Sequence, residues 1–179
     1  MTASSPRASA AAGRAICAVW LGLALAALAP LLVWLDRGLI ELAVVPHALL
    51  QGEPHAITPL ARLVGVVATA IPSGLLAWGL LGLLPALRRL REGVAITGET
   101  GRAVARLGIA VGLVGAYEPI GRAVLRVALT MGATPGQLNI AVGLSASGVL
   151  LVTLGLTLVA LGHVLRDAAA AVAENEGFV

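Results

Sequence analysis

The sequence lacks several features that soluble proteins and enzymes usually have. Its 179 residues contain no lysine, one cysteine and few aromatic side chains, and only 12% of them are charged. A soluble domain carries roughly 25% charged residues, so this chain has too little polar surface to face water on all sides. The single cysteine, Cys17, excludes an internal disulfide. No catalytic triad, nucleophile elbow or phosphate-binding glycine motif is present, so the sequence predicts neither enzymatic activity nor a cofactor.

What the sequence does contain is apolar surface in long runs. Hydrophobic residues make up 59% of the chain, and the mean hydropathy is +0.97. Roughly 20 apolar residues in a helix cross a hydrocarbon layer about 30 Å thick. The sequence therefore predicts an all-α polytopic membrane protein, a four-helix transmembrane bundle formed by one domain over residues 15–179. The expected spans are residues 15–35, 59–84, 103–129 and 138–165, with a disordered tail at 1–14 and a second tail at 166–179.

An arginine-rich loop separates the second span from the third and sets the predicted topology. It holds Arg88, Arg89, Arg91, Arg102 and Arg106. Arginine clusters beside spans mark cytoplasmic loops, so we expect this loop and both termini to be cytoplasmic. The abundance of Ala, Gly and Arg indicates a GC-rich bacterial genome and hence the bacterial inner membrane. We attribute the net charge of +3 to topology and contact with anionic lipids, not to direct nucleic-acid binding.

The first loop on the far side, residues 36–58, contains a short apolar stretch and a few polar side chains. Gly38–Leu50 is predicted to be a short interfacial helix. Nearby His47, Glu53 and His55 could offer metal ligands, but their spacing matches no zinc pattern. We therefore interpret them as solvated loop residues and predict no metal.

The second and third spans carry features that interrupt a plain apolar helix. Pro72 and Gly74 predict a kink in the second span. In the third, Glu118 and Arg122 are four residues apart, so they share a helix face and can pair inside the membrane. Such charges are functional by default, but the interpretation that we favour is a structural pair that neutralises itself near the membrane interface. Close helix packing is the predicted role of a glycine face on the third span, which consists of Gly108, Gly112 and Gly115.

Two stretches resemble a known family. One is residues 90–108, LREGVAITGETGRAVARLG, and the other is the C-terminal VLRDAAAAVAENEGFV. With four spans around them, the chain resembles the DUF2975 family of bacterial four-helix membrane proteins. The resemblance covers about the second half of the chain. It implies a protein without established enzymatic activity, and a small helix-turn-helix regulator as a partner.

The sequence as a whole favours a non-enzymatic membrane protein whose inner face binds another protein. Membrane lipids are the other expected partners, and a homo-oligomer stays open. Two alternatives are an accessory subunit of a larger membrane complex and a small transporter or channel component. The predicted binding surface combines the loop arginines with the acidic tail, namely Arg88, Arg89, Arg91, Arg102, Arg106, Glu174, Asn175 and Glu176.

Overall fold

Long helices make up most of the described chain. The computed structural model describes residues 6–93, 97–133, 143 and 145–176. The four long helices are α1 (Pro6–Leu35), α4 (Pro59–Arg91), α5 (Gly98–Thr130) and α6 (Ala146–Glu176). Between α1 and α4 lie α2 (Arg37–Leu39), the π-helical turn η1 (Ile40–Val44) and α3 (Val45–His47). The described residues contain no strand, and the predicted all-α fold with four apolar helices is confirmed.

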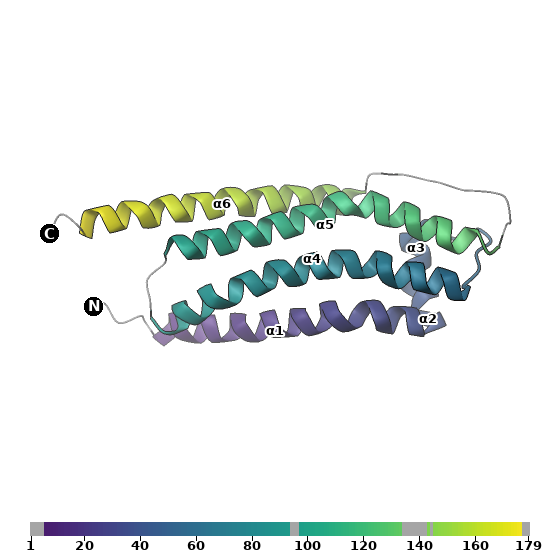
Figure 1. Cartoon of the computed structure of the whole chain (residues 1–179), viewed down its shortest axis with the longest axis horizontal. Helices are drawn as coiled ribbons and strands as arrows, with labels where there is room; N and C mark the ends of the chain where they lie inside the picture. The colour runs from purple at the N-terminus through teal and green to yellow at the C-terminus, as the bar shows by residue number, and fades with distance from the viewer. Residues whose placement is uncertain (1–5, 94–96, 134–142, 144, 177–179) are drawn as a thin grey trace.

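The long helices run antiparallel in chain order and form an open bundle. α1 packs against α4, α4 against α5, and α5 against α6, and Figure 1 shows them side by side in that order. The start of α1 and the end of α6 lie at the same end of the bundle, where α4 also leads into α5 (Figure 1). Each of the four helices is long and apolar enough to cross a membrane.

The first helix begins earlier than the sequence predicted. α1 starts at Pro6, so the disordered tail predicted for residues 1–14 is wrong for residues 6–14, while residues 1–5 lie outside the described residues. Ala8 to Ala12 are alanine except for one serine, and alanine is the best helix former, so they extend a helix that the membrane span has already nucleated. Proline is well tolerated at the first position of such a helix.

The last helix begins later than predicted. The fourth span was expected from residue 138, but α6 begins at Ala146, and the described residues just before it, Gly143 and Ser145, are not helical. Ser145 Oγ accepts a hydrogen bond from the N–H of Gly148 at 2.9 Å, which caps the new helix. The same helix then continues without a break past the predicted end of the span to Glu176.

A proline inside α4 frees a carbonyl that α5 satisfies. Pro72 has no N–H to donate to the carbonyl of Ala68, four residues earlier. Tyr117 of α5 donates its hydroxyl to that carbonyl at 3.0 Å. The hydrogen bond ties the two helices together at the proline. Figure 1 shows α4 curved along its length, but a kink located at Pro72 stays a prediction.

The hydrophobic core lies at one end of the bundle, where the segment α2–η1–α3 folds back over the long helices. Trp34 of α1 is 2% exposed, and its ring lies against Gly65 of α4, where a Cβ would collide with the indole. The other core residues are Ile40, Val44, Val45, Ala48, Leu50, Ala61, Ala68, Leu125 and Leu129. The short helical segment predicted in this loop is therefore present, and its apolar side packs into the protein. We call the end of the bundle that α2, η1 and α3 cover the capped end.

A seam of glycines joins α5 to α6. Gly101, Gly108 and Gly115 recur every seven residues on α5, and each lies against the carbonyl of its counterpart on α6. The counterparts are Gly162, Gly155 and Gly148 in turn. A Cβ at these α5 glycines would lie 2.5 to 2.7 Å from a carbonyl oxygen, so only glycine allows the two backbones to pack this closely. Gly112 also faces α6 but has more room, because a Cβ added there would lie 3.9 Å from Gly155 Cα.

Candidate functional site

The end of the bundle opposite the core is rich in arginine, and we call it the basic end. The last turn of α4 carries Arg88, Arg89 and Arg91, and the first turns of α5 carry Arg102 and Arg106. Arg166 of α6 lies beside Gly98 and Gly101 of α5, and exposed Arg14 of α1 lies towards the same end. Of the loop arginines, Arg89 forms an ion pair with Glu99, and both side chains are about half exposed. The structure thus gathers the predicted arginines on one surface.

Arg106 is the least exposed of the loop arginines. Its guanidinium lies over the ring of Trp78, 4.3 Å from the ring centre, a favourable cation–π contact. Its side chain crosses α4 at Gly82, where a Cβ would come within 2.7 Å of Arg106 Cδ. The missing side chain at Gly82 therefore provides the path by which Arg106 reaches Trp78. This contact was not predicted, because the two residues lie far apart in the sequence and nothing local pairs them.

The C-terminal part of α6 extends beyond the bundle. Since α6 passes the start of α5 at Arg166, residues 167–176 add about 15 Å of helix at 1.5 Å per residue. Figure 1 shows this end projecting past the other helices. Residues 167–174 are exposed apart from half-buried Ala169. Glu174 therefore projects into open space, while the side chains of Asn175 and Glu176 lie outside the described residues.

The predicted ion pair of the third span is present near the capped end. Arg122 Nη2 donates to Glu118 Oε1 at 2.5 Å, and the two side chains are 16% and 10% exposed. Ser147 donates to the same oxygen at 2.9 Å, and Ser145 donates to Glu118 Oε2. One carboxylate thus links α5 to the start of α6, through a partner set that the spacing of Glu118 and Arg122 alone did not predict.

A second ion pair, formed by a buried arginine with a more exposed glutamate, was not predicted from the sequence. Arg126 is 8% exposed, and its Nη2 donates to both carboxylate oxygens of Glu53, at 2.7 and 2.6 Å. Its Nη1 donates to the carbonyl of Leu49 at 2.8 Å. Leu49 adopts a left-handed backbone, with φ of 57°, which is costly for a branched residue. Arg126 therefore fixes the first loop onto α5.

The two histidines of the first loop lie in different surroundings. His55 Nδ1 is 3.0 Å from the carbonyl of Glu53, and Nε2 is 3.0 Å from the Glu41 carboxylate. Both partners accept hydrogen bonds, so the protonated ring satisfies both contacts. The bond to the Glu53 carbonyl, aided by Glu41, raises the pKa of His55. Partial burial, followed by the charge of Arg122, lowers the pKa of His47.

The described residues hold no group of three or more His, Cys, Asp and Glu side chains placed to bind a metal. Of the three side chains weighed as ligands, Glu53 is engaged by Arg126 and His55 by Glu41. His47 lies elsewhere, on the rim of a cavity of about 330 Å³ between α3, α4, α5 and α6. That cavity also borders Tyr117, Glu118 and Ser147, so polar groups form part of its lining, and we call it the polar cavity.

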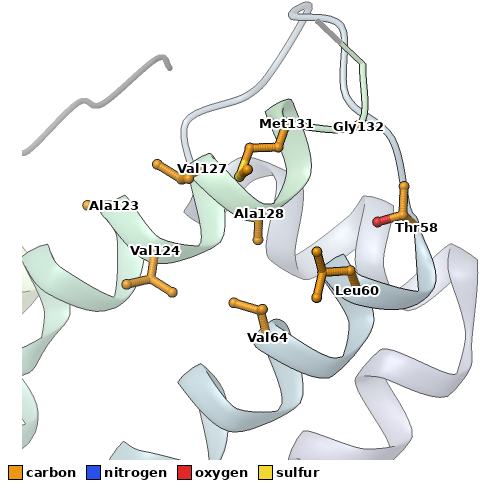
Figure 2. Close-up of a pocket in the computed structure, with 9 residues that line it drawn as sticks. All are labelled: Thr58, Leu60, Val64, Ala123, Val124, Val127, Ala128, Met131 and Gly132. Atoms are coloured by element: carbon orange, nitrogen blue, oxygen red, sulfur yellow. The ribbon is translucent and has the colours of Figure 1, made fainter. Parts of the chain in front are cut away.

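A larger cavity is apolar and separate from these charges. It measures about 660 Å³ and lies between α4 and α5 at the capped end. Figure 2 shows Leu60 and Val64 of α4 facing Val124 and Ala128 of α5 across it. Thr58 supplies the polar atom among the lining side chains drawn there. Such a lining offers no group for acid–base or metal chemistry, and in a membrane it would face acyl chains.

The separation of Arg106 and Arg126 along α5 matches the hydrocarbon thickness of a bilayer. Arg106 and Arg126 are 20 residues apart on α5, or about 30 Å, which equals the hydrocarbon thickness. Exposed Trp20 and Trp78 lie towards the level of Arg106, since Gly22 of α1 lies beside Leu80 of α4. Tryptophan favours the membrane interface. The class that the fold and these features define is an α-helical protein with four potential membrane spans.

No family model, curated protein or solved structure matches this chain. The resemblance to the DUF2975 family therefore stays a prediction, and the function has to be inferred from the chain's own geometry.

Proposed function

We propose that this chain is a non-enzymatic protein of the bacterial inner membrane that binds a protein partner at its cytoplasmic, basic end. The single observation that carries the proposal is the extension of α6. Residues 167–176 continue as a helix beyond the bundle, and their described side chains are exposed apart from half-buried Ala169. A short isolated helix is only marginally stable in water. Residues 167–176 extend a helix that the preceding span has already nucleated, so they form a helical surface to which a partner can bind.

The charge of the basic end supports the same proposal. The exposed loop arginines at the same end of the bundle as the α6 extension offer cationic groups, and the extension itself adds Asp167 and Glu174. Mixed charges of this kind steer an encounter and set its orientation more than they add affinity. The small helix-turn-helix regulator implied by the family resemblance is the partner that we would look for first.

Site-specific crosslinking in living cells tests the proposal. A photo-crosslinking residue at Val172 of the extension should capture one defined soluble protein. The same residue at Gln51, in the first loop, is the matched control and should not capture it. Replacing Arg88 and Arg91 by Gln should weaken capture from Val172. Capture of the same proteins from both positions, or of none, would contradict the proposal.

The proposed orientation has its own test. In a Cys17→Ser background, a cysteine at Gln51 should react with a membrane-impermeant reagent in intact cells, and one at Glu92 should react only after lysis. Both positions are exposed, so access to the reagent depends on sidedness alone. Labelling of position 92 in intact cells would place the basic end outside.

A second candidate function has one specific observation in its favour. The polar cavity between α3 and α6 brings Tyr117, Glu118 and His47 together within the apolar part of the bundle. A small transporter or channel component needs such a polar site. However, Glu118 already accepts from Arg122, Ser145 and Ser147, which leaves little capacity for a substrate. Uptake assays in vesicles that contain the Glu118→Gln variant would distinguish a transport role from a structural one.

A further inference from the structure

A groove at the basic end has the chemistry of an anion site. It lies between α4 and α5, has a volume of about 280 Å³, and is bordered by Gly82 and Pro85 on one side and by Glu99, Arg102 and Arg106 on the other. Arg102 and Arg106 are four residues apart, so they lie one above the other on the same face of α5. Two guanidinium groups therefore border one small space.

The charges in this groove do not cancel one another. Its single acidic side chain, Glu99, is held by Arg89 outside the groove. Arg102 is exposed and has no hydrogen-bond or ion-pair partner among the described residues. Arg106 Nε is buried, and it too has no partner among the described residues. A buried donor without an acceptor is costly, so the groove offers both positive charge and unused hydrogen-bond donors.

The surface next to the groove is apolar, which identifies the kind of anion. Trp78, over which the Arg106 guanidinium lies, is 43% exposed, and Leu81 on the next turn of α4 is 50% exposed. A soluble anion would gain nothing from these side chains, whereas a lipid would place its acyl chains along them. Arg106 also lies about 30 Å along α5 from Arg126, at the depth where headgroups begin.

We propose that this groove binds the phosphate headgroup of an anionic phospholipid. Arg102 and Arg106 donate charge-assisted hydrogen bonds to the phosphate oxygens, a task for which the planar guanidinium is well suited. Trp78 and Leu81 contact the first carbons of the acyl chains. Gly82 is needed for this site, because a side chain at position 82 would collide with the Arg106 side chain where it crosses α4. The proposal goes beyond the proposed function, since it requires no protein partner.

Lipid titration of the purified full chain in detergent tests the site. Phosphatidylglycerol is the probe, and phosphatidylcholine with the same acyl chains and inorganic phosphate are the comparison arms. Native mass spectrometry measures the lipids bound, and the melting temperature reports the stabilisation. The wild-type chain should bind phosphatidylglycerol and be stabilised by it. The Arg102→Gln/Arg106→Gln variant should bind at least about tenfold more weakly.

The matched control removes the same charge from the same end but outside the groove. Arg88→Gln/Arg91→Gln should bind phosphatidylglycerol within about twofold of the wild type. An equal loss in this control would mean that diffuse charge attracts the lipid, and equal binding of phosphatidylcholine would mean that the anionic headgroup is not recognised. Stabilisation by inorganic phosphate alone would assign the groove to a free anion. Each of these results overturns the proposal.

The double variant could lose its fold, because Arg106 also contacts Trp78. The single variant Arg102→Gln avoids this difficulty, since Arg102 is exposed and unpaired in the described structure. Its melting temperature without lipid should equal that of the wild type, and its affinity for phosphatidylglycerol should fall several-fold. An unchanged affinity in this variant would also overturn the proposal.

Discussion

The two ends of the bundle use the same residue type in opposite ways. At the capped end, Arg126 is buried and Arg122 is partly buried, and each is paired with a carboxylate. At the basic end, Arg88, Arg91 and Arg102 are exposed, and the described residues provide no partner for them. An arginine in low dielectric is costly unless it is paired, whereas an exposed one costs little and gains little. The capped end therefore uses arginine to fix its fold, and the basic end keeps arginine available for contacts outside the chain.

The largest expected effect of a single substitution is at Arg126. Arg126→Gln leaves the Glu53 carboxylate and the carbonyl of left-handed Leu49 without their donor. We expect a loss of about 3 kcal/mol in the free energy of unfolding, measured by thermal or denaturant unfolding in detergent. The matched substitution at the other end, Arg88→Gln, should change stability by less than about 0.5 kcal/mol. Equal losses at the two positions would remove the distinction between the ends.

The glycine seam runs through both ends, so it allows a second comparison. An alanine at Gly101 would meet the Gly162 carbonyl at 2.5 Å. An alanine at Gly148 would meet the Gly115 carbonyl at 3.2 Å and would also collide with the Glu118 carboxylate. Overpacking costs typically 1–3 kcal/mol. We expect Gly101→Ala to cost roughly 1 kcal/mol more than Gly148→Ala, because the atoms that Gly101→Ala meets belong to the backbone of α6, whereas the Glu118 carboxylate is the end of a side chain and can shift.

Measuring both alanine variants by thermal unfolding, alone and combined with Glu118→Ala, checks the origin of that difference. The cost of Gly148→Ala should fall in the Glu118→Ala background, because the colliding carboxylate is gone, while the cost of Gly101→Ala should stay the same. A cost of Gly148→Ala that persists in full would mean that the backbone of the seam, and not the carboxylate, resists the alanine.

The pair of Glu118 and Arg122 should show coupling in a double-mutant cycle. Glu118→Gln leaves a partly buried Arg122 unpaired, and Arg122→Gln leaves Glu118 with its two serine donors. We expect losses of about 1–2 kcal/mol for each single variant and a double variant less destabilised than their sum. Arg122→Gln should cost less than Glu118→Gln because of the serines. Strictly additive melting shifts would show that the two charges do not interact.

How far the sequence predicts this structure depends on how local each signal is. The apolar runs and the spacing of Glu118 and Arg122 are signals within single helices. The four apolar helices and the ion pair that they predict are both present. The cap of α4 is equally local: Thr58, a preferred N-cap residue, accepts from the N–H of Ala61 at 3.1 Å. Each of these signals acts through neighbours within one or two helical turns, so no knowledge of the tertiary fold is required.

The signals that were missed involve partners far apart in the chain. Arg126 and Glu53 are 73 residues apart in the chain, with the whole of α4 between them. Tyr117 donates its hydrogen bond to a backbone carbonyl of α4, and no side-chain pattern in the sequence indicates such a partner. The seven-residue period of Gly101, Gly108 and Gly115 is visible in the sequence, although the predicted glycine face began only at Gly108. The matching period on α6 would have revealed the seam. The first residues of α1 and α6, Pro6 and Ala146, were also not predicted, because they depend on weak helix propensities and on one serine cap.

The smallest expected effect is a pH dependence in the first loop, and it concerns the capped end alone. The pKa of His55 is raised above its ordinary value of 6.5, because the Glu53 carbonyl and the Glu41 carboxylate both accept from the ring. Its contribution to stability is therefore fully present below the unfolded pKa and is lost as the pH rises through the folded pKa. Nearby Arg37 opposes the shift. We expect a loss below about 1 kcal/mol between about pH 5.5 and 8, since Glu41 is 40% exposed.

His47 must be removed to observe this effect, because its dependence has the opposite sign. Burial and Arg122 lower the pKa of His47, while Glu118 raises it, so its protonation destabilises the fold as the pH falls. In a His47→Gln background, the melting temperature should decrease from about pH 5.5 to 8, and adding His55→Gln should abolish that decrease. A decrease that survives the His55→Gln substitution would show that the proton-linked contact lies outside the first loop, and it would contradict the assignment of this contact to the capped end.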